Sequence, residues 1–321
     1  MRAITDQNGR LTFSDGHDLA PPGPGQIRVR IHATAVNRAD LVQREGAYPP
    51  PPGSSPILGL ECSGVVEEVG PEVGWPRPGE QVCALLSGGG YAEYAVFPAA
   101  HAMPIPQGTG LLEAAALPEV FTTAWLNLRR EGELGVKERV LLHAAASGVG
   151  TAALQLCRAW GNPTFATVGS ADKEARCREL GADETANRHD GPWLEKVKAW
   201  GGADLILDPV GGAYLGDNIA ALNPRGRLIN IGLMGGKDAP LPLGALLVKR
   251  LTVRGSVLRS RNDAEKADIL YRMREEVWPL IEAGTVKPIV DQVFPIEQAQ
   301  EAHERVGRDE TIGKVLLRLP D

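Results

Sequence analysis

Cysteine is scarce in this chain of 321 residues, which contains only four, Cys62, Cys83, Cys157 and Cys177. None of them belongs to a Cys-x-x-Cys pair, and the last two lie in segments with helical character. Such spacing argues against a disulfide framework. It predicts buried free thiols in a reducing, cytoplasmic setting.

Other absences narrow the class of protein. No uninterrupted apolar run approaches the roughly 20 residues of a membrane span, and the N-terminus turns polar too early for a signal peptide. The net charge is −6 and no basic block stands out, which argues against a nucleic-acid partner. With 43% hydrophobic and 23% charged residues, the chain has the composition of a globular protein, and its length suggests about two domains.

Residues 1–118 have β character. The segment 26–32 alternates apolar and polar residues with a period of two, which predicts a half-buried strand. Turns rich in glycine and proline follow at short intervals, at 49–53, 76–79 and 87–90. Short strands separated by such turns predict a barrel-like β domain.

From about residue 119 strands alternate with helices, which predicts a doubly wound parallel sheet of the α/β class. The tail from about residue 286 returns to β character and should rejoin the first domain. We therefore expect one domain from 1–118 with 285–321, and a second from 119–284. The predicted strands are 139–143, 164–168, 204–208, 227–231 (after a turn at 223–226), 251–257 and 314–319, and the predicted helices are 151–160 and 172–180.

The segment 140–155 is the strongest single pattern, because it combines a buried strand, a turn of small residues and a helix that starts at the turn. Backbone N–H groups of such a turn can bind a pyrophosphate at the helix N-terminus. Against the G-x-G-x-x-G pattern, Ala145 and Ser147 replace the first two glycines and only Gly150 remains. The alternative is a tight strand–helix turn that serves packing alone.

The end of the next strand predicts which nucleotide is bound. In NAD-binding units an acidic residue about 20 positions past the glycines binds the ribose 2′-hydroxyl. Here that place reads Gly169-Ser170, with Lys173 one turn later and Arg176 and Arg188 as further candidates. We predict NADPH rather than NADH. The alternative for the cations is a solvated helix face, and the nearby Asp172 fits the first turn of a helix.

Several segments follow one pattern in order along the chain: 37–40, 59–64, 78–82, 89–94, 143–150, 232–236, 258–261 and 312–315. Together they resemble the medium-chain dehydrogenase/reductase superfamily, in particular its zinc-free quinone oxidoreductase (zeta-crystallin-like) branch and, within it, the tumour-suppressor-inducible type. The resemblance covers nearly the whole chain. It implies a Rossmann domain that binds NADPH and a discontinuous GroES-like β-barrel catalytic domain.

The departures from zinc-bearing relatives are informative. Those relatives have a cysteine at the position of Asn37 and a histidine at the position of Leu60, and residues 84–156 contain none of the cysteines of their additional lobe. A catalytic zinc needs three protein ligands, so the resemblance implies no metal. We interpret Glu61 as a paired buried carboxylate rather than as a residue that supports a metal ligand.

The resemblance implies hydride transfer from NADPH to a quinone. Tyr48 would then donate a hydrogen bond to the quinone oxygen or stack on its ring, and Asn37 would lie near the nicotinamide. The alternatives are an aromatic residue packed on the proline run 49–52 and an asparagine that stabilises a turn. Two other functions stay open: an NADPH-dependent alkenal or enone reductase, and a protein that binds NADPH without catalysis.

The resemblance assigns further residues to the cofactor, beside Gly169, Ser170, Lys173 and Arg188 from the strand-end pattern. Met234 and Leu258 are equally compatible with a core role. Arg259 and Arg261 are candidates for contact with substrate or a partner, with exposed arginines as the favoured alternative, and His143 is interpreted as a structural histidine. We further expect a homodimer that forms through the strand at 251–257, because an exposed edge strand is a ready pairing surface. The residues assigned to the cofactor are Thr123, Ser147, Gly148, Val149, Gly150, Gly169, Ser170, Lys173, Arg188, Gly232, Leu233, Met234, Val257 and Leu258.

Overall fold

A computed structural model describes residues 1–7 and 9–320 of the chain. The chain divides into two compact units, each of which is considered separately. The first unit comprises Met1–Thr122, Leu258–Ala283 and Pro288–Asp321, and the second comprises Thr123–Val257 and Gly284–Lys287. Among the described residues, no helix combines the length and the apolar character that a bilayer crossing requires.

The second unit contains a six-stranded sheet in which every neighbouring pair is parallel. The strand order is β10-β9-β8-β11-β12-β13, which is the order of a doubly wound dinucleotide-binding fold, with its switch point between β8 and β11. The predicted α/β class is therefore confirmed. The strands are β8 (Val140–Leu142), β9 (Thr164–Val168), β10 (Glu184–Asn187), β11 (Ala203–Asp208), β12 (Leu222–Asn230) and β13 (Thr252–Gly255).

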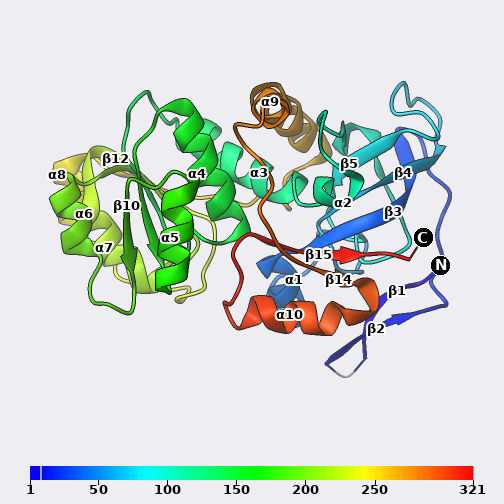
Figure 1. The fold of residues 1–321 in the computed structure, drawn as a ribbon, viewed down its shortest axis with the longest axis horizontal. Helices are drawn as coiled ribbons and strands as arrows, with labels where there is room; N and C mark the ends of the chain where they lie inside the picture. Colours follow the sequence, from blue (N-terminus) through cyan, green and yellow to red (C-terminus); the bar gives the residue numbers. More distant parts are fainter. Residues whose placement is uncertain (8, 321) are drawn as a thin grey trace. The chain divides into compact units, whose positions relative to one another are not determined.

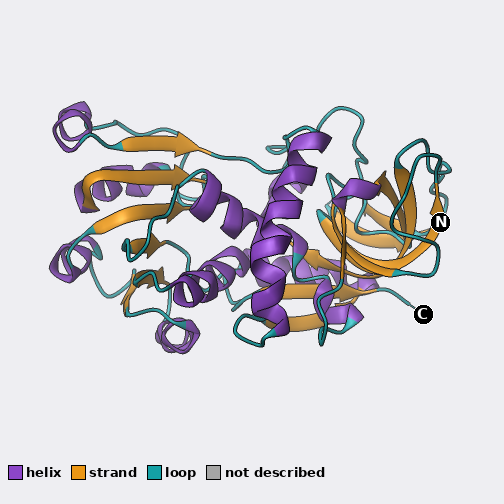
Figure 2. Cartoon of the chain, turned by 90° about the horizontal axis from the view of Figure 1, so that it is seen from above, coloured by secondary structure: helices purple, strands orange, loops and turns teal. Residues whose placement is uncertain are grey.

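Helices cover both faces of this sheet (Figure 2). Strands β8, β9 and β11 are almost wholly buried, because they have apolar side chains on both faces. One core cluster packs Phe165 and Ile206 against Val197 and Ile219 from the helices. The helices of this unit are α4 (Gly148–Trp160), α5 (Ala171–Leu180), α6 (Leu194–Trp200), α7 (Leu215–Ala221) and α8 (Leu243–Lys249).

Local signals in the sequence explain where these elements stop. Strand β9 has the predicted bounds, and α5 ends at Gly181, whose φ of +119° is favourable only for glycine. The prediction of a turn at 223–226 was wrong, because these residues lie within β12. The register jumps there from Leu222 to Arg227, and Arg225 has a φ of +66°, so the turn signal produced a bulge rather than a strand end.

The first unit is built on a seven-stranded sheet with the order β14-β15-β3-β4-β5-β7, in which β6 also pairs with β3. All of its pairs are antiparallel except β14 with β15. A separate hairpin joins β1 (Ala3–Gln7) and β2 (Arg10–Ser14). The strands are β3 (Gln26–Val36), β4 (Glu61–Val69), β5 (Gln81–Leu85), β6 (Tyr94–Pro98), β7 (Ala102–Pro104), β14 (Val290–Pro295) and β15 (Lys314–Arg318).

The two ends of the chain share this sheet. Strand β15 runs beside β3 with Val315 opposite Val36 (Figure 1), so the tail returns to the β unit as the sequence predicted. The four cysteines are free and buried, in agreement with their spacing. The remaining helices are α1 (Arg38–Arg44), α2 (Leu111–Ala114), α3 (Pro118–Trp125), α9 (Asp263–Glu282) and α10 (Ala299–Gly307).

Helix α9 belongs to the first unit, although the predicted second domain, 119–284, included it. The Trp278 indole N–H donates to the carbonyl of Pro104 at 2.7 Å, and the Gln107 N–H donates to the Glu282 carboxylate at 3.1 Å. Helical periodicity marks such an element in the sequence but does not say which sheet it packs against.

Candidate active site

The carboxyl ends of the parallel strands in the second unit bring most of the predicted cofactor residues to one edge of the sheet. Each predicted group follows the end of a different strand, and ligands of doubly wound folds bind at this edge. Residues 147–150 follow β8, Gly169 and Ser170 follow β9, Arg188 follows β10, residues 232–234 follow β12, and Val257 follows β13.

The turn after β8 has the form of a pyrophosphate cradle. Ser147 caps α4, since its side-chain oxygen accepts a hydrogen bond from the N–H of Gly150 at 3.2 Å. A Cβ on Gly150 would lie 2.5 Å from the carbonyl oxygen of Ala145, so only glycine lets the helix start this close to the turn. The first-turn N–H groups of a helix and its dipole favour an anion, and this turn therefore fits a pyrophosphate.

The end of β9 carries Gly169 and Ser170 in place of an acidic residue, and Asp172 and Glu174 lie beyond it in the first turn of α5. Ser170 caps α5 by accepting a hydrogen bond from the N–H of Lys173 at 3.3 Å. A Cβ on Gly169 would meet the Arg188 guanidinium at about 3.0 Å, so this guanidinium covers the position at which NAD-binding units carry their acidic residue. The arrangement fits the negative charge of a ribose 2′-phosphate.

Buried polar residues fix the ends of β8 and β11. Nδ1 of His143 lies 2.8 Å from the Thr167 hydroxyl, and Nε2 lies 2.7 Å from Oδ1 of Asn218. Asn218 in turn donates to the Asp208 carboxylate at 3.1 Å. Burial lowers the pKa of His143, and both ring nitrogens are engaged, which supports the structural interpretation of this histidine.

The other predicted cofactor residues differ in their surroundings. Met234 is 51% exposed and Leu233 and Val257 are also exposed, so Met234 is not a core residue. Leu258 is buried and belongs to the first unit. Thr123 lies on α3 as the first residue of the second unit, and its carbonyl accepts a hydrogen bond from Asn127 at 2.8 Å.

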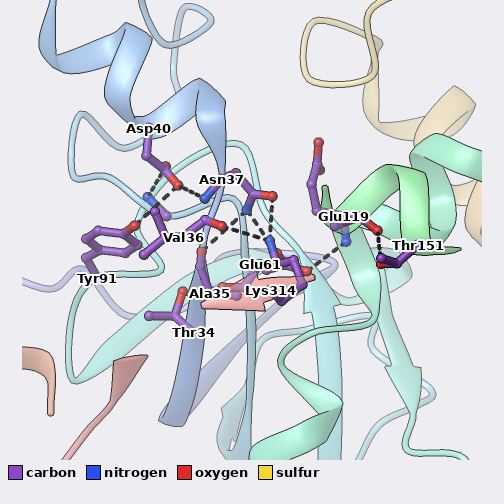
Figure 3. Close-up of polar contacts among 12 residues, drawn as sticks. Thr34, Ala35, Val36, Asn37, Asp40, Glu61, Tyr91, Glu119, Thr151 and Lys314 are labelled. Atoms are coloured by element: carbon purple, nitrogen blue, oxygen red, sulfur yellow. Dashed lines mark hydrogen bonds and ion pairs between the residues drawn. The ribbon is translucent and has the colours of Figure 1, made fainter. Parts of the chain in front are cut away.

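In the first unit, Asn37 belongs to a network with Glu61 and Lys314 (Figure 3). Nδ2 of Asn37 donates to Glu61 Oε1 at 2.9 Å, and Oδ1 accepts from the Lys314 ammonium at 2.6 Å. The ammonium also lies 2.7 Å from Glu61 Oε1, and it donates to the carbonyl of Val36 at 3.0 Å. All three ammonium protons are thus used, and the orientation of the Asn37 amide is fixed.

This network does not suit a metal ion. The ammonium of Lys314 occupies the oxygen side of Asn37, and Leu60 is a buried apolar residue. Over residues 1–7 and 9–320, no group of three histidine, cysteine or acidic side chains is placed to hold a metal. Glu61 is a paired buried carboxylate, as interpreted from the sequence.

Asp40 connects the Asn37 end of this network to Tyr91 and His303. Its carboxylate accepts hydrogen bonds from the N–H groups of Asn37 at 2.8 Å and Gly59 at 3.0 Å, and lies 3.3 Å from the Tyr91 hydroxyl. The same hydroxyl lies 3.0 Å from Nε2 of His303. Burial raises the pKa of Asp40 to about 6. Asp40 therefore ties the start of α1 to the loop before β4.

Tyr48 packs against a buried arginine. The Arg259 guanidinium carbon lies 5.2 Å from the centre of the Tyr48 ring, and Nη1 donates to the Tyr48 carbonyl at 3.3 Å. Burial raises the pKa of Tyr48 to about 12, with a further contribution from the Glu119 carboxylate. The phenol therefore keeps its proton at neutral pH and can donate a hydrogen bond.

The sequence did not single out Lys314, Asp208 or Asn218 as site residues. Lys314 has a visible signal, because a lysine opens a strand whose centre is apolar. Asp208 and Asn218 have none, because their link to His143 joins segments 75 residues apart in the chain.

Comparison with known protein families finds two models that match this chain. The family model described as "Alcohol dehydrogenase GroES-like domain" matches residues 23–107, and "Zinc-binding dehydrogenase" matches residues 148–271. The rat synaptic vesicle membrane protein VAT-1 homolog is 31% identical over 312 residues, which cover 92% of this chain and 77% of that protein.

Solved structures give the same result over the full length. An NAD-dependent alcohol dehydrogenase is 32% identical with a TM-score of 0.87, and covers 100% of both chains. Escherichia coli quinone oxidoreductase complexed with NADPH is 29% identical with a TM-score of 0.88, and covers 99% of each chain. The chain therefore belongs to the medium-chain dehydrogenase/reductase family of oxidoreductases.

Proposed function

We propose that this protein is an NADPH-dependent quinone reductase that works without a metal. The observation that carries the proposal is the end of β9, where Gly169 and Ser170 stand in place of an acidic residue and the Arg188 guanidinium lies beside Gly169. The similarity to the E. coli quinone oxidoreductase supports the same cofactor and acceptor. The narrower assignment to the tumour-suppressor-inducible branch stays a prediction.

The residues at the carboxyl edge of the second unit would hold the cofactor. Residues 147–150 would bind the pyrophosphate through backbone N–H groups, and Lys173 and Arg188 would pair with the 2′-phosphate. Residues 232–234 and Thr123, Val257 and Leu258 would line the nicotinamide end. These roles combine the observed strand ends with the family resemblance.

When bound, NADPH would supply the hydride. The chain's own task is then to orient the acceptor and to stabilise the oxygen on which negative charge develops. Tyr48 suits this task because its phenol keeps its proton and can donate to that oxygen. Both N–H bonds of the Asn37 amide are engaged, by Glu61 at 2.9 Å and by the carbonyl of Ala35 at 3.4 Å, so Asn37 would give the site a fixed shape near the nicotinamide. A quinone needs little Lewis-acid help, which agrees with a side-chain set that does not suit a metal.

The test is NADPH oxidation with 1,2-naphthoquinone and 1,4-benzoquinone, in parallel with the enone 2-cyclohexenone. We expect turnover with the quinones well above the uncatalysed rate. Turnover with the enone alone would replace the proposal by a double-bond reductase. Tight NADPH binding without turnover of any acceptor would replace it by a binding role.

We also propose a cytoplasmic homodimer. Strand β13 is the edge of its sheet and exposes Val253, and the adjacent α8 exposes Leu243, Leu247 and Val248, the last two by 75% and 84%. Exposed apolar residues together with a strand whose outer edge has no neighbour are typical of a pairing surface. The four buried free thiols suit a reducing compartment.

A further inference from the structure

Two cations are buried beside Tyr48 in the first unit. Arg259 is 5% exposed and Lys266 is 4% exposed. The Arg259 Nε donates to the carbonyl of Ser87 at 2.9 Å, and the Lys266 ammonium donates to the Ser87 hydroxyl at 2.6 Å. Both cations therefore converge on one serine, and the guanidinium also lies over the Tyr48 ring.

Neither cation has an anionic partner. Within the described ranges, their hydrogen bonds go to oxygens of Ser87 and Tyr48 and to no carboxylate. Nη2 of Arg259 is buried and has no hydrogen-bond partner. Other cations of the same segment differ, because Arg261 pairs with Glu265 and Arg272 pairs with Asp268.

This arrangement is costly in the protein alone. Arginine and lysine are almost never fully buried unless they are paired, and an unsatisfied buried donor loses its hydration without compensation. Burial lowers the pKa of Arg259 and of Lys266. The charges of Tyr48, Asp40 and Glu119 oppose this shift at Arg259, and those of Asp263 and Glu119 oppose it at Lys266. An anion next to the cluster would relieve the cost, since charges interact strongly where water is excluded.

We propose that Ser87, Arg259 and Lys266 form a cationic subsite that selects acceptors with an anionic substituent, such as a carboxylate, sulfonate or phosphate. The inference rests on the proposed function, because Tyr48 connects the cluster to the acceptor. The Arg259 guanidinium lies over the Tyr48 ring, and Ser87 joins it to Lys266. A ring that stacks on or bonds to Tyr48 would therefore bring an anionic substituent toward the cluster.

A binding experiment tests this without turnover. Calorimetry would compare 2-naphthalenesulfonate with the uncharged 2-naphthalenesulfonamide on the intact protein. We expect the sulfonate to bind about tenfold more tightly, and we expect Arg259→Met and Lys266→Met to abolish most of that preference. Arg259→Lys and Lys266→Arg keep the charge and should keep the preference. Arg272→Met, an exposed cation of the same helix as Lys266, is the matched control.

Equal binding of the two probes to the wild type would overturn the inference. So would a preference that survives both methionine substitutions in folded protein, or one that Arg272→Met removes equally. Competition by sodium sulfate shows whether a free anion suffices: displacement of the sulfonate places its charged group at the cluster, and failure to displace it at high sulfate contradicts an anion site.

A kinetic comparison separates this inference from the proposed function. The Michaelis constants for a sulfonated quinone (1,4-naphthoquinone-2-sulfonate) and a neutral one (2-methyl-1,4-naphthoquinone) would be compared, and their ratio followed from wild type to Arg259→Met. Turnover of both quinones with an unchanged ratio would retain quinone reduction and reject the anionic subsite. Sulfonate-selective binding without turnover of any quinone would reject quinone reduction and retain the subsite.

Discussion

Two side chains of the candidate active site, Asn37 and Tyr48, have surroundings that define what each can do. The Asn37 amide has one orientation because Lys314 and Glu61 hold its two ends. Tyr48 is half-buried, and burial raises the pKa of its phenol further above neutral pH, to about 12. The sequence and the family resemblance identified Asn37 and Tyr48, but Lys314 lies 277 residues from Asn37. The partners of these residues could not be predicted, since only the pairing of β15 with β3 brings them together.

Tyr48→Phe tests the role of the phenol. The change removes one donor to the developing oxyanion and keeps the ring over which Arg259 lies. We expect kcat for quinone reduction to fall by about 10- to 100-fold, with little change in melting temperature.

The matched control for that change is Tyr271→Phe. Tyr271 is an exposed tyrosine with the Arg274 guanidinium 5.4 Å from its ring centre. It should leave kcat unchanged. An equal rate for wild type and Tyr48→Phe would remove Tyr48 from the mechanism.

Arg188→Gln tests the choice of cofactor. Loss of a charge-assisted contact to the 2′-phosphate should raise the Kd of NADPH by about 10- to 100-fold and leave that of NADH nearly unchanged. Fluorescence titration measures both constants. Arg178→Gln removes an exposed cation of α5 that lies 3.8 Å from the Glu174 carboxylate, and should have no such effect. A similar loss for both nucleotides would contradict the assignment of Arg188.

Asp40→Asn tests the buried carboxyl. Burial raises the pKa of Asp40 in the folded protein to about 6, above the unfolded value of about 3.9. Its contribution to stability is therefore full below the unfolded pKa and is lost as the pH rises through the folded pKa. The variant lacks this titration. Its free energy of unfolding should therefore rise relative to that of the wild type by on the order of 2 kcal/mol between about pH 4 and pH 6. Urea unfolding across this range would show a constant difference if the assignment is wrong.

At the scale of elements, regular strands of the second unit were predictable and irregular joints were not. Strand β9 matches its predicted bounds, because it is a continuous apolar run between turn signals. The bulge in β12 was not predicted, since Asn223-Pro224-Arg225-Gly226 has the composition of a turn. The attachment of α9 to the first unit depends on single contacts, such as that of Trp278 with Pro104.

Gly150→Ala tests the joint between β8 and α4. The added Cβ would lie 2.5 Å from the backbone of Ala145, so the first turn of α4 must shift. We expect a lower melting temperature and NADPH binding weakened by about tenfold or more.

Gly216→Ala is the control for this joint, because a Cβ in α7 at that position meets nothing within 4 Å. It should stabilise the protein by about 0.5–1 kcal/mol. Unchanged NADPH binding in Gly150→Ala would separate this turn from the cofactor.

At the scale of the whole molecule, the proposal predicts two copies of the chain in one particle. Leu247→Glu places a charge on the apolar face of α8 and should convert a dimer into a monomer by light scattering. Val136→Glu, which changes an exposed valine of the second unit outside α8 and β13, should not. A wild-type mass of one chain at working concentration would exclude the dimer.

We propose above all that this member of the family transfers reducing equivalents from NADPH to a quinone. The most direct measurement is kcat/KM for NADPH and for NADH with 1,4-benzoquinone under identical conditions. We predict rapid oxidation of NADPH and a kcat/KM at least about tenfold lower for NADH. Equal use of both nucleotides, or no oxidation above the uncatalysed rate, would contradict the account.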